Sequence, residues 1–199
     1  TPAGLKLVTP VDYDKLGIVC GSSFYFPGDR ENGGVFKHAA MMCTVACLKK
    51  AKTIKDPALS KRLRDLAFFM IDKTLPYKTL SDPYTLKGNP RFCTQYNNSE
   101  TGEGIGPILS GTASWLTLAF YEIMGIELEG DHLHIDPIIN TDRFDYTIKL
   151  NDTPIEVSIQ KGNDFKVNSQ TRYIFDGKET DRTIALPTDK KAHKLEVLL

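Results

Sequence analysis

A buried helix begins within RENGGVFKHAAMMCTVACLKKA, the stretch from Arg30 to Ala51. Apolar residues between positions 35 and 48 cover most of the helical circumference, so we expect this helix to be buried on several sides. Gly33, Gly34 and several polar side chains stand directly before it. A helix start of this kind leaves backbone N–H groups that can face an anion. The stretch therefore predicts an interior helix with a candidate anion site at its entrance.

Two further helices are indicated downstream. A one-sided apolar stripe predicts a helix over residues 56–75, which starts with an Asp-Pro pair suited to an N-cap and a first helical position. A third helix is predicted over residues 110–124 and ends at Gly125. The long connection between them, residues 77–109, is rich in Gly, Pro, Asn, Ser and Thr and shows no period. Long connections inside compact domains tend to be functional, so this loop is a candidate site.

After Gly125 the spacing of apolar residues changes from helical to alternating. Alternation predicts short strands, and Asn-Asp, Gly-Asn and Asp-Gly pairs between them predict turns. The strand and turn candidates are, in order, residues 144–150, Asn151-Asp152, 155–159, Gly162-Asn163, Asp176-Gly177 and 193–199. This pattern predicts a β-sandwich or jelly-roll for the tail of the chain.

The composition excludes several classes of protein. The 199 residues carry 25 basic and 25 acidic side chains, which is not the basic excess of a nucleic-acid platform. No apolar run approaches the roughly 20 residues that span a bilayer, and residues 1–4 lack the features of a signal peptide, so we expect a cytoplasmic location. Cys43 and Cys47 stand one helical turn apart, without a CxxC pair or a histidine cluster, which favours packing over metal binding.

The three predicted helices have apolar faces too wide to cover one another completely, and large exposed apolar patches are rare on monomers. We therefore expect residues 1–125 to be the C-terminal piece of a larger helical domain. Residues 126–199 then form a trailing β-domain. An N-terminal part of the same protein is the partner expected to cover the helices.

Two short motifs carry the anion hypothesis. His38 falls in the first turn of the first helix, where an imidazole can donate to an anion that the helix dipole also favours. Ser110 and Gly111 open the third helix, and a hydroxyl beside helix-start amides makes a phosphate cradle. The alternatives are a structural histidine in a capped helix and an ordinary N-cap with a tight turn.

The long loop carries a different chemistry. Its central part is dense in hydrogen-bonding side chains around one aromatic ring, a mixture that suits the hydroxyls and apolar ring faces of a sugar. The candidate sugar contacts here are Gln95, Tyr96, Asn98 and Glu100. The alternative is a solvated loop without a ligand.

Three motifs taken in order resemble a known family: PGDRENGGVFKHA at residues 27–39, LSGTASW at 109–115 and GDHLHIDP at 130–137. Together they are similar to the C-terminal part of glycoside hydrolase family 94. That family includes cellobiose and chitobiose phosphorylases, 1,2-β-oligoglucan phosphorylases and the phosphorylase-like domain of cyclic β-1,2-glucan synthases. The resemblance runs from about Pro10 to Pro137 and more loosely to the end.

The resemblance implies an α+β multidomain fragment: the C-terminal part of an (α/α)6 barrel, followed by a β-sandwich (jelly-roll) domain. It also implies an inverting reaction in which inorganic phosphate attacks the anomeric carbon of a β-linked gluco-oligosaccharide. An inverting hydrolase needs a second carboxylate to activate water. Phosphate is already a nucleophile, so an anion pocket can replace that carboxylate, and no cofactor or metal is needed.

The resemblance also assigns residues. His38 matches the family's phosphate-binding histidine, and Ser110 with Gly111 matches its Thr-Gly pair. Tyr25, Arg30 and Glu31 match positions near the bound sugar. The family's general acid is an aspartate upstream of this region, so no catalytic residue is expected in this chain and the chain alone is expected to be inactive.

Several alternatives stay open. The loop over residues 89–106 is more similar to that of the β-1,2-oligoglucan phosphorylases than to that of the cellobiose enzymes, which favours a β-1,2 linkage. The same motifs also fit the phosphorylase-like domain of a cyclic β-1,2-glucan synthase. A carbohydrate-binding module without catalysis is the alternative from another class, and a homodimer is left open.

Overall fold

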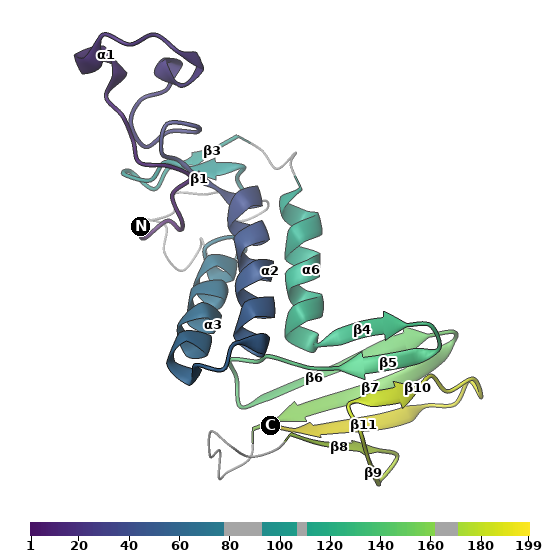
Figure 1. Cartoon of the computed structure of the whole chain (residues 1–199). Coiled ribbons are helices and arrows are strands. Elements are labelled where there is room, and N and C mark those ends of the chain that lie inside the picture. The colour runs from purple at the N-terminus through teal and green to yellow at the C-terminus, as the bar shows by residue number, and fades with distance from the viewer. Residues whose placement is uncertain (78–92, 107–110, 162–170) are drawn as a thin grey trace. The chain divides into compact units, whose positions relative to one another are not determined.

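A computed structural model describes residues 1–77, 93–106, 111–161 and 171–199 (Figure 1). The chain divides into two compact units, residues 1–119 and 120–199. Among the described residues, no helix combines the length and the apolar character needed to cross a bilayer.

The first unit is built on a pair of packed helices, α2 (Lys37–Thr53) and α3 (Pro57–Asp72). The N-cap of α3 is Asp56, whose carboxylate accepts hydrogen bonds from the first-turn amides of Ala58 at 2.9 Å and Leu59 at 3.1 Å. Side chains from both helices are fully buried, among them Met41 and Leu48 of α2 and Met70 of α3. A third helix, α6 (Thr112–Met124), begins in this unit.

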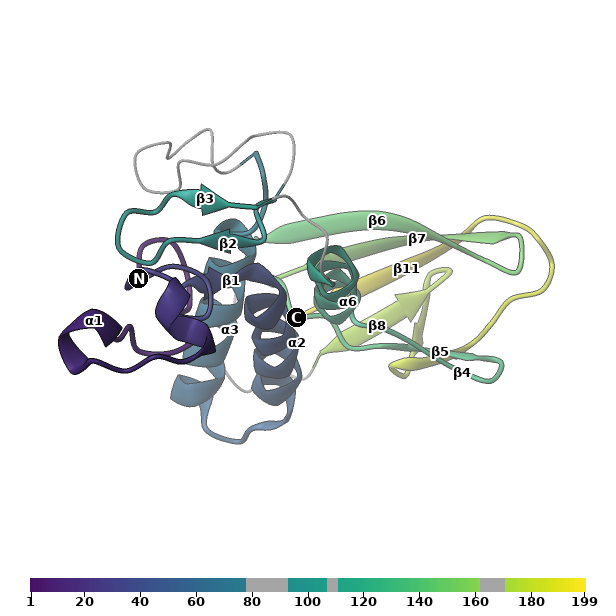
Figure 2. The ribbon, with the colours of Figure 1, turned by 90° about the horizontal axis from the view of Figure 1, so that it is seen from above.

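Short elements gather at the entrance of α2. A small antiparallel sheet has the order β1 (Val35–Phe36), β2 (Tyr96–Asn97), β3 (Gly104–Ile105). Figure 2 shows β1 running directly into the start of α2, with β2 and β3 alongside. The chain before β1 forms an arm that contains α1 (Tyr13–Leu16) and a 3-10 turn over Gly21–Phe24 (Figure 1).

The second unit consists of two sheets. One has the order β10 (Thr183–Ala185), β5 (His132–Ile135), β4 (Ile126–Glu129). The other has five strands in the order β6 (Arg143–Leu150), β7 (Thr153–Gln160), β11 (His193–Leu198), β8 (Arg172–Phe175), β9 (Lys178–Thr180). Strand β11 is parallel to β7 and antiparallel to β8. The core beneath them holds Leu133, Ile135, Ile155, Val157, Ile159, Leu195 and Val197.

The expected architecture, part of an (α/α)6 barrel followed by a β-sandwich, is wrong. The described residues form an α+β fold with four α-helices and mixed sheets. A wide apolar helix face shows that a helix is buried but does not show by what. Here α2 is covered by α3, and its first residue, Lys37, also bonds to Ala3 of the N-terminal segment. Alternation likewise predicts where strands lie in the sequence but not which strands pair. The parallel pairing of β11 with β7 was not predicted.

Candidate functional site

The site begins at the start of α2. Phe36 is the N-cap of this helix and makes no side-chain capping bond within the described structure. The amide of Lys37 donates to the carbonyl of Gln95 at 3.0 Å, which ties the helix start to the loop before β2. His38 follows in the first turn and is half-buried. An imidazole at this position stands at the positive end of a 17-residue helix.

A second helix start meets His38 at this point. A methyl group placed on Gly111 would stand 2.7 Å from Nε2 of His38 and 2.8 Å from Cε1, so the imidazole lies directly against the Gly111 backbone. The carbonyl of Gly111 accepts the first helical bond of α6 from the amide of Trp115 at 3.0 Å. The starts of α2 and α6 therefore converge on one imidazole, and both helix dipoles favour negative charge there. Ser110, the third predicted phosphate contact, lies outside the described residues.

Tyr96 connects this entrance to a carboxylate. Its hydroxyl donates to Oε1 of Glu31 at 2.8 Å, and its ring stacks on Phe36 with centroids 4.6 Å apart. Phe36 in turn meets the ring of His38 edge-on at 5.5 Å. Burial, with the Glu31 carboxylate next in effect, raises the pKa of Tyr96 to about 12. The phenol therefore stays protonated and keeps the Glu31 carboxylate oriented across a wide pH range.

A tight loop presents the two charged candidates. Arg30 has a positive φ of 40°, and its guanidinium lies 5.5 Å from the centre of the Tyr25 ring. A Cβ on Gly34 would stand 2.6 Å from both the nitrogen and the carbonyl oxygen of Arg30, so only glycine fits at that point. The tight turn thus fixes the backbone that carries the Arg30 and Glu31 side chains, and the Tyr25 ring lies beside the arginine.

The remaining predicted sugar contacts have structural duties. Oδ1 of Asn98 accepts from the amides of Glu100 at 2.9 Å and Thr101 at 3.0 Å, so this oxygen builds a turn. A Cβ on Gly28 would stand 2.9 Å from Cγ of Glu100, which brings this loop against the glycine-rich one. Gln95 bonds through its backbone, accepting from Lys37 and donating to Gly106. Of these three, only Glu100 is well exposed.

Two polar atoms between the loops were missed by the sequence analysis. Oδ1 of Asp29 and Oγ of Ser99 are buried and make no hydrogen bond within the described part of the chain. They belong to neighbouring loop segments, because the amide of Ser99 donates to the carbonyl of Gly28 at 2.9 Å. Buried polar atoms are normally hydrogen-bonded, so these two oxygen atoms are a local exception where the two loops pack together. In the sequence, both residues belong to polar loops, and nothing there indicates that these oxygen atoms are buried.

Lys37 was also missed, although it is next to His38. Its side chain is 2% exposed, and Nζ donates to the carbonyls of Ala3 at 3.0 Å and Lys73 at 2.7 Å. Burial lowers the pKa of this amine to about 7. The available signal was spacing, since Lys37 shares a helix face with the buried Met41 and Leu48. Its role is to fasten the N-terminal segment and the end of α3 to the helix that carries His38.

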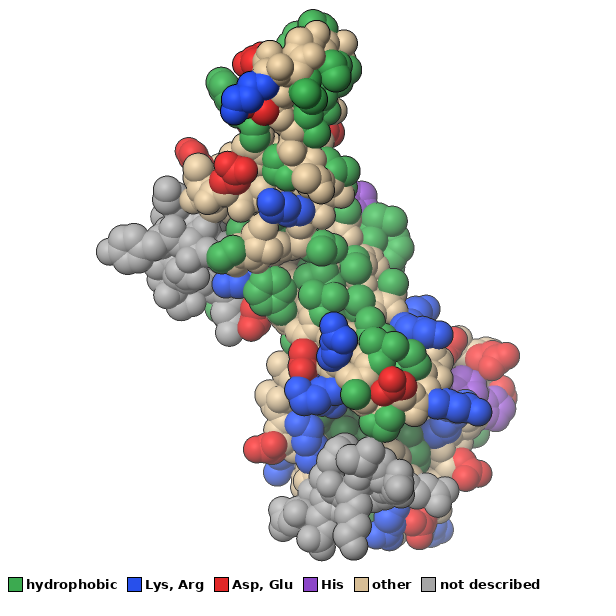
Figure 3. Space-filling view, turned by 60° about the vertical axis from the view of Figure 1, so that its left-hand side comes forward, with side chains coloured by type: hydrophobic (Ala, Val, Ile, Leu, Met, Phe, Trp, Pro, Cys, Tyr) green, Lys and Arg blue, Asp and Glu red, His purple; other side chains and the backbone are tan. Residues whose placement is uncertain are grey.

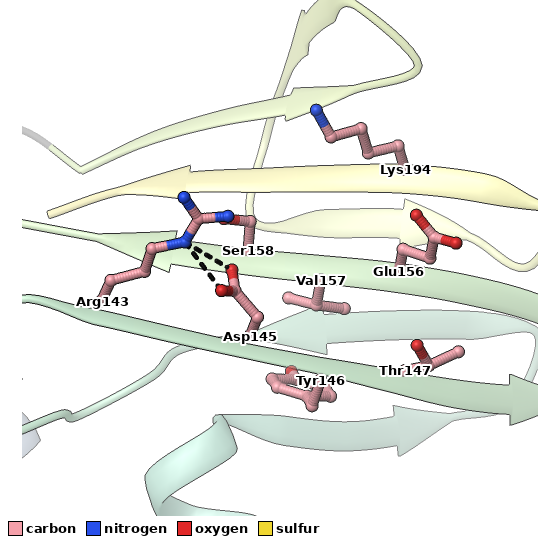
Figure 4. A pocket seen from close by; sticks show the side chains of 8 residues that line it. All are labelled: Arg143, Asp145, Tyr146, Thr147, Glu156, Val157, Ser158 and Lys194. Atoms are coloured by element: carbon pink, nitrogen blue, oxygen red, sulfur yellow. Dashed lines mark hydrogen bonds and ion pairs between the residues drawn. The ribbon is translucent and has the colours of Figure 1, made fainter.

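The second unit has a separate hollow of about 390 Å³ on the outer face of its five-stranded sheet. Figure 4 shows Arg143 and Asp145 of β6 pointing toward each other, with Nε 2.7 Å from Oδ2. Glu156 of β7 and Lys194 of β11 also line it. No predicted site residue falls in this hollow, and Arg143 and Asp145 form an ion pair on the sheet surface.

No protein-family model matches the chain, and no curated protein is similar enough to count as a relative. Among the residues that the structure describes, no group of three or more His, Cys, Asp or Glu side chains is arranged to hold a metal ion.

Proposed function

We propose that this chain supplies the phosphate pocket and part of the sugar site of an inverting β-glucan phosphorylase. The observation that carries the proposal is the contact between the His38 imidazole and Gly111, at the starts of two helices. An inorganic phosphate dianion is the ligand suited to two converging helix starts and an imidazole donor. The resemblance of the three sequence motifs to glycoside hydrolase family 94 supports the same choice.

The proposed reaction is the one that the resemblance implies. A phosphate oxygen attacks the anomeric carbon, and the bond from that carbon to the glycosidic oxygen breaks. The departing oxygen takes a proton from a general acid that we place outside this chain, as the resemblance implies. His38 and the Gly111 backbone hold the nucleophile, and Ser110 adds a hydroxyl. Donors already fixed at the anion need no reorganisation during the reaction.

Sugar contacts come from the loop that precedes α2 and from the loop around β2. Glu31, oriented by Tyr96, accepts from hydroxyl groups, while Tyr25 offers a ring face and Arg30 a donor. We propose glucose units joined by β-1,2 linkages, in line with the resemblance of the 89–106 loop. We place the reaction in the cytoplasm, which agrees with four cysteines that are all free.

The full gene product tests the proposal. Incubated with inorganic phosphate and β-1,2-linked glucose oligomers, it should release α-glucose 1-phosphate. His38→Ala should lower kcat/KM for phosphate by about 10- to 100-fold, because a charge-assisted hydrogen bond contributes about 1.5–3 kcal/mol. His132→Ala, at an exposed histidine of the second unit, is the matched control and should behave like the parent protein.

An unchanged phosphate dependence in His38→Ala contradicts the assignment of this histidine. Binding of oligosaccharide without any sugar phosphate, at all phosphate concentrations, contradicts the phosphorylase and favours a carbohydrate-binding module.

A further inference from the structure

The arm before β1 carries an open pocket of its own. Residues 11–14 form one wall and residues 23–27 the other, around a volume of about 180 Å³. By the same measure a single water needs about 10–15 Å³, so the pocket has room for a ligand larger than one water. The pocket lies entirely within the first unit and contains none of the predicted phosphate contacts.

The lining mixes ring faces with oxygen acceptors. Tyr13, Phe24 and Phe26 supply aromatic surface, and Asp12 and Asp14 supply carboxylates. Such carboxylates repel an anion, so the pocket is unsuited to a second phosphate. A pyranose has the opposite requirements, because its hydroxyls donate to carboxylates and its apolar face stacks on a ring.

The aromatic side chains are placed to receive a ligand. Phe24 is 80% exposed and Phe26 81% exposed, and Figure 3 shows apolar side chains gathered over the arm. Two strongly exposed aromatic side chains on one short segment are available for contact with a ligand. Asp12 already accepts from the amide of Lys15 at 3.2 Å and pairs with its ammonium at 2.8 Å, which lowers the pKa of Asp12 and keeps the carboxylate charged.

One buried side chain fastens both walls to the candidate site. Asn32 is 1% exposed, and its Nδ2 donates to the carbonyls of Val11 at 2.8 Å and Tyr25 at 2.9 Å. Its Oδ1 accepts from the amide of Val11 at 2.8 Å. Asn32 directly follows Glu31, so the pocket is fixed to the loop that presents the sugar contacts.

Tyr25 belongs to both places. It lines the pocket and also carries the Arg30 guanidinium over its ring. We infer that the pocket between residues 11–14 and 23–27 is an additional sugar subsite, which holds a glucose unit of the oligosaccharide away from the bond that is cleaved. This inference rests on the proposed function and adds a preference for chain length to it.

The test compares oligosaccharides of different length on the full gene product. Phe24→Leu and Phe26→Leu keep an apolar side chain but remove the ring. Each should weaken binding of the longer β-1,2-linked glucose oligomers roughly two- to tenfold and leave the disaccharide unaffected, because an aromatic contact contributes about 0.5–1.5 kcal/mol. Phe24→Tyr should retain the affinity of the parent protein. Val19→Ala, on the same arm at an 86% exposed position outside the pocket, is the control.

Binding is measured by calorimetry without phosphate, and phosphorolysis separately. If sugar phosphate is released but the length preference is the same in both Leu variants, the subsite is refuted and the proposed function stands. If the Leu variants lose affinity for the longer oligomers but no sugar phosphate forms, the subsite stands and the phosphorylase does not. If no oligosaccharide binds and the variants instead change the oligomeric state, the aromatic rings belong to a protein interface and the inference is overturned.

Discussion

Around the entrance of α2, strands of only two residues and glycine turns bring together side chains from positions 25 to 111. The second unit is held instead by a long hairpin, in which the eight-residue strands β6 and β7 pair along their whole length. Irregular backbone leaves amides and carbonyls free to be aimed, whereas a regular ladder uses them in pairing. We therefore expect substitutions in the first region to affect ligand binding and substitutions in the second to affect stability.

The largest effect expected from this comparison is that of Gly111→Val. The new side chain would occupy the space of the His38 imidazole, which costs about 4 kcal/mol in phosphate use if the imidazole and one backbone donor are displaced. Gly111 does not have a positive φ, so the backbone accepts a side chain and unfolding should change little. Phosphate kinetics and urea unfolding together check this. A folded variant with lower stability but unchanged phosphate kinetics would contradict this expectation.

Leu195→Ala tests the opposite region. Leu195 is fully buried in β11, between β7 and β8, and its truncation should lower the free energy of unfolding of the second unit by about 3 kcal/mol, within the usual range of 2–5 kcal/mol. Hydrogen exchange of the amides in residues 143–160 measures the loss. Trp115, the one tryptophan of the sequence, lies in the first unit, and its fluorescence transition should stay unchanged.

The next effect is a pH dependence of the first unit. The pKa of Lys37 is about 7 in the folded chain, below its ordinary value of 10.5, so between these values the unfolded chain binds a proton that the folded chain lacks. Stability therefore rises with pH across this window, by about 1.4 kcal/mol per unit near pH 8–9. Urea unfolding followed by Trp115 fluorescence should show this slope, and Lys37→Met should remove it. An identical slope in the variant would show that another group is responsible.

The smallest effect is of opposite sign and belongs to the second unit. His193 of β11 meets Asp176 through Nδ1 at 2.7 Å and Asp189 through Nε2 at 2.9 Å. The hydrogen bonds to these carboxylates raise the pKa of His193 and lower those of both aspartates. The stabilisation is complete below the ordinary histidine pKa and is lost as pH rises through the raised one.

Thermal unfolding of His193→Gln should lack this decline between pH 6 and 8. Hydrogen exchange within β11 locates the change to the second unit. A parent protein whose second unit gains stability over this range would contradict the ion pairs.

The secondary structure was largely predictable from local patterns. The helices expected at 35–51, 56–75 and 110–124 correspond to α2, α3 and α6, and the Asn151-Asp152 and Asp176-Gly177 turns are confirmed. The Gly162-Asn163 turn lies outside the described residues. Strands of two residues, such as β1 and β2, are too short for any period, and the arrangement of the elements in space was predicted wrongly. Pairing between distant strands depends on tertiary packing that alternation does not encode.

The candidate site was predictable in composition but not in detail. Glycines and polar residues ahead of an apolar helix pointed to His38 and Gly111, which the structure brings together. The hydrogen bond from Tyr96 to Glu31 joins residues 65 positions apart and left no local trace. The burial of Lys37 was not predicted, because a lysine at a helix start is ordinarily solvated. Asn32 holds the arm through hydrogen bonds to the carbonyls of Val11 and Tyr25, but in the sequence it is only one polar residue of a loop.

The position of β11 has a consequence for how the second unit is made. This strand is inserted between β7 and β8, which precede it in the chain, so neither the β6–β7 hairpin nor the β8–β9 hairpin can reach its final neighbour first. During synthesis on a ribosome both hairpins must wait until residues 193–198 emerge. Until then they expose unpaired edges of the kind that promotes misassembly in nascent chains.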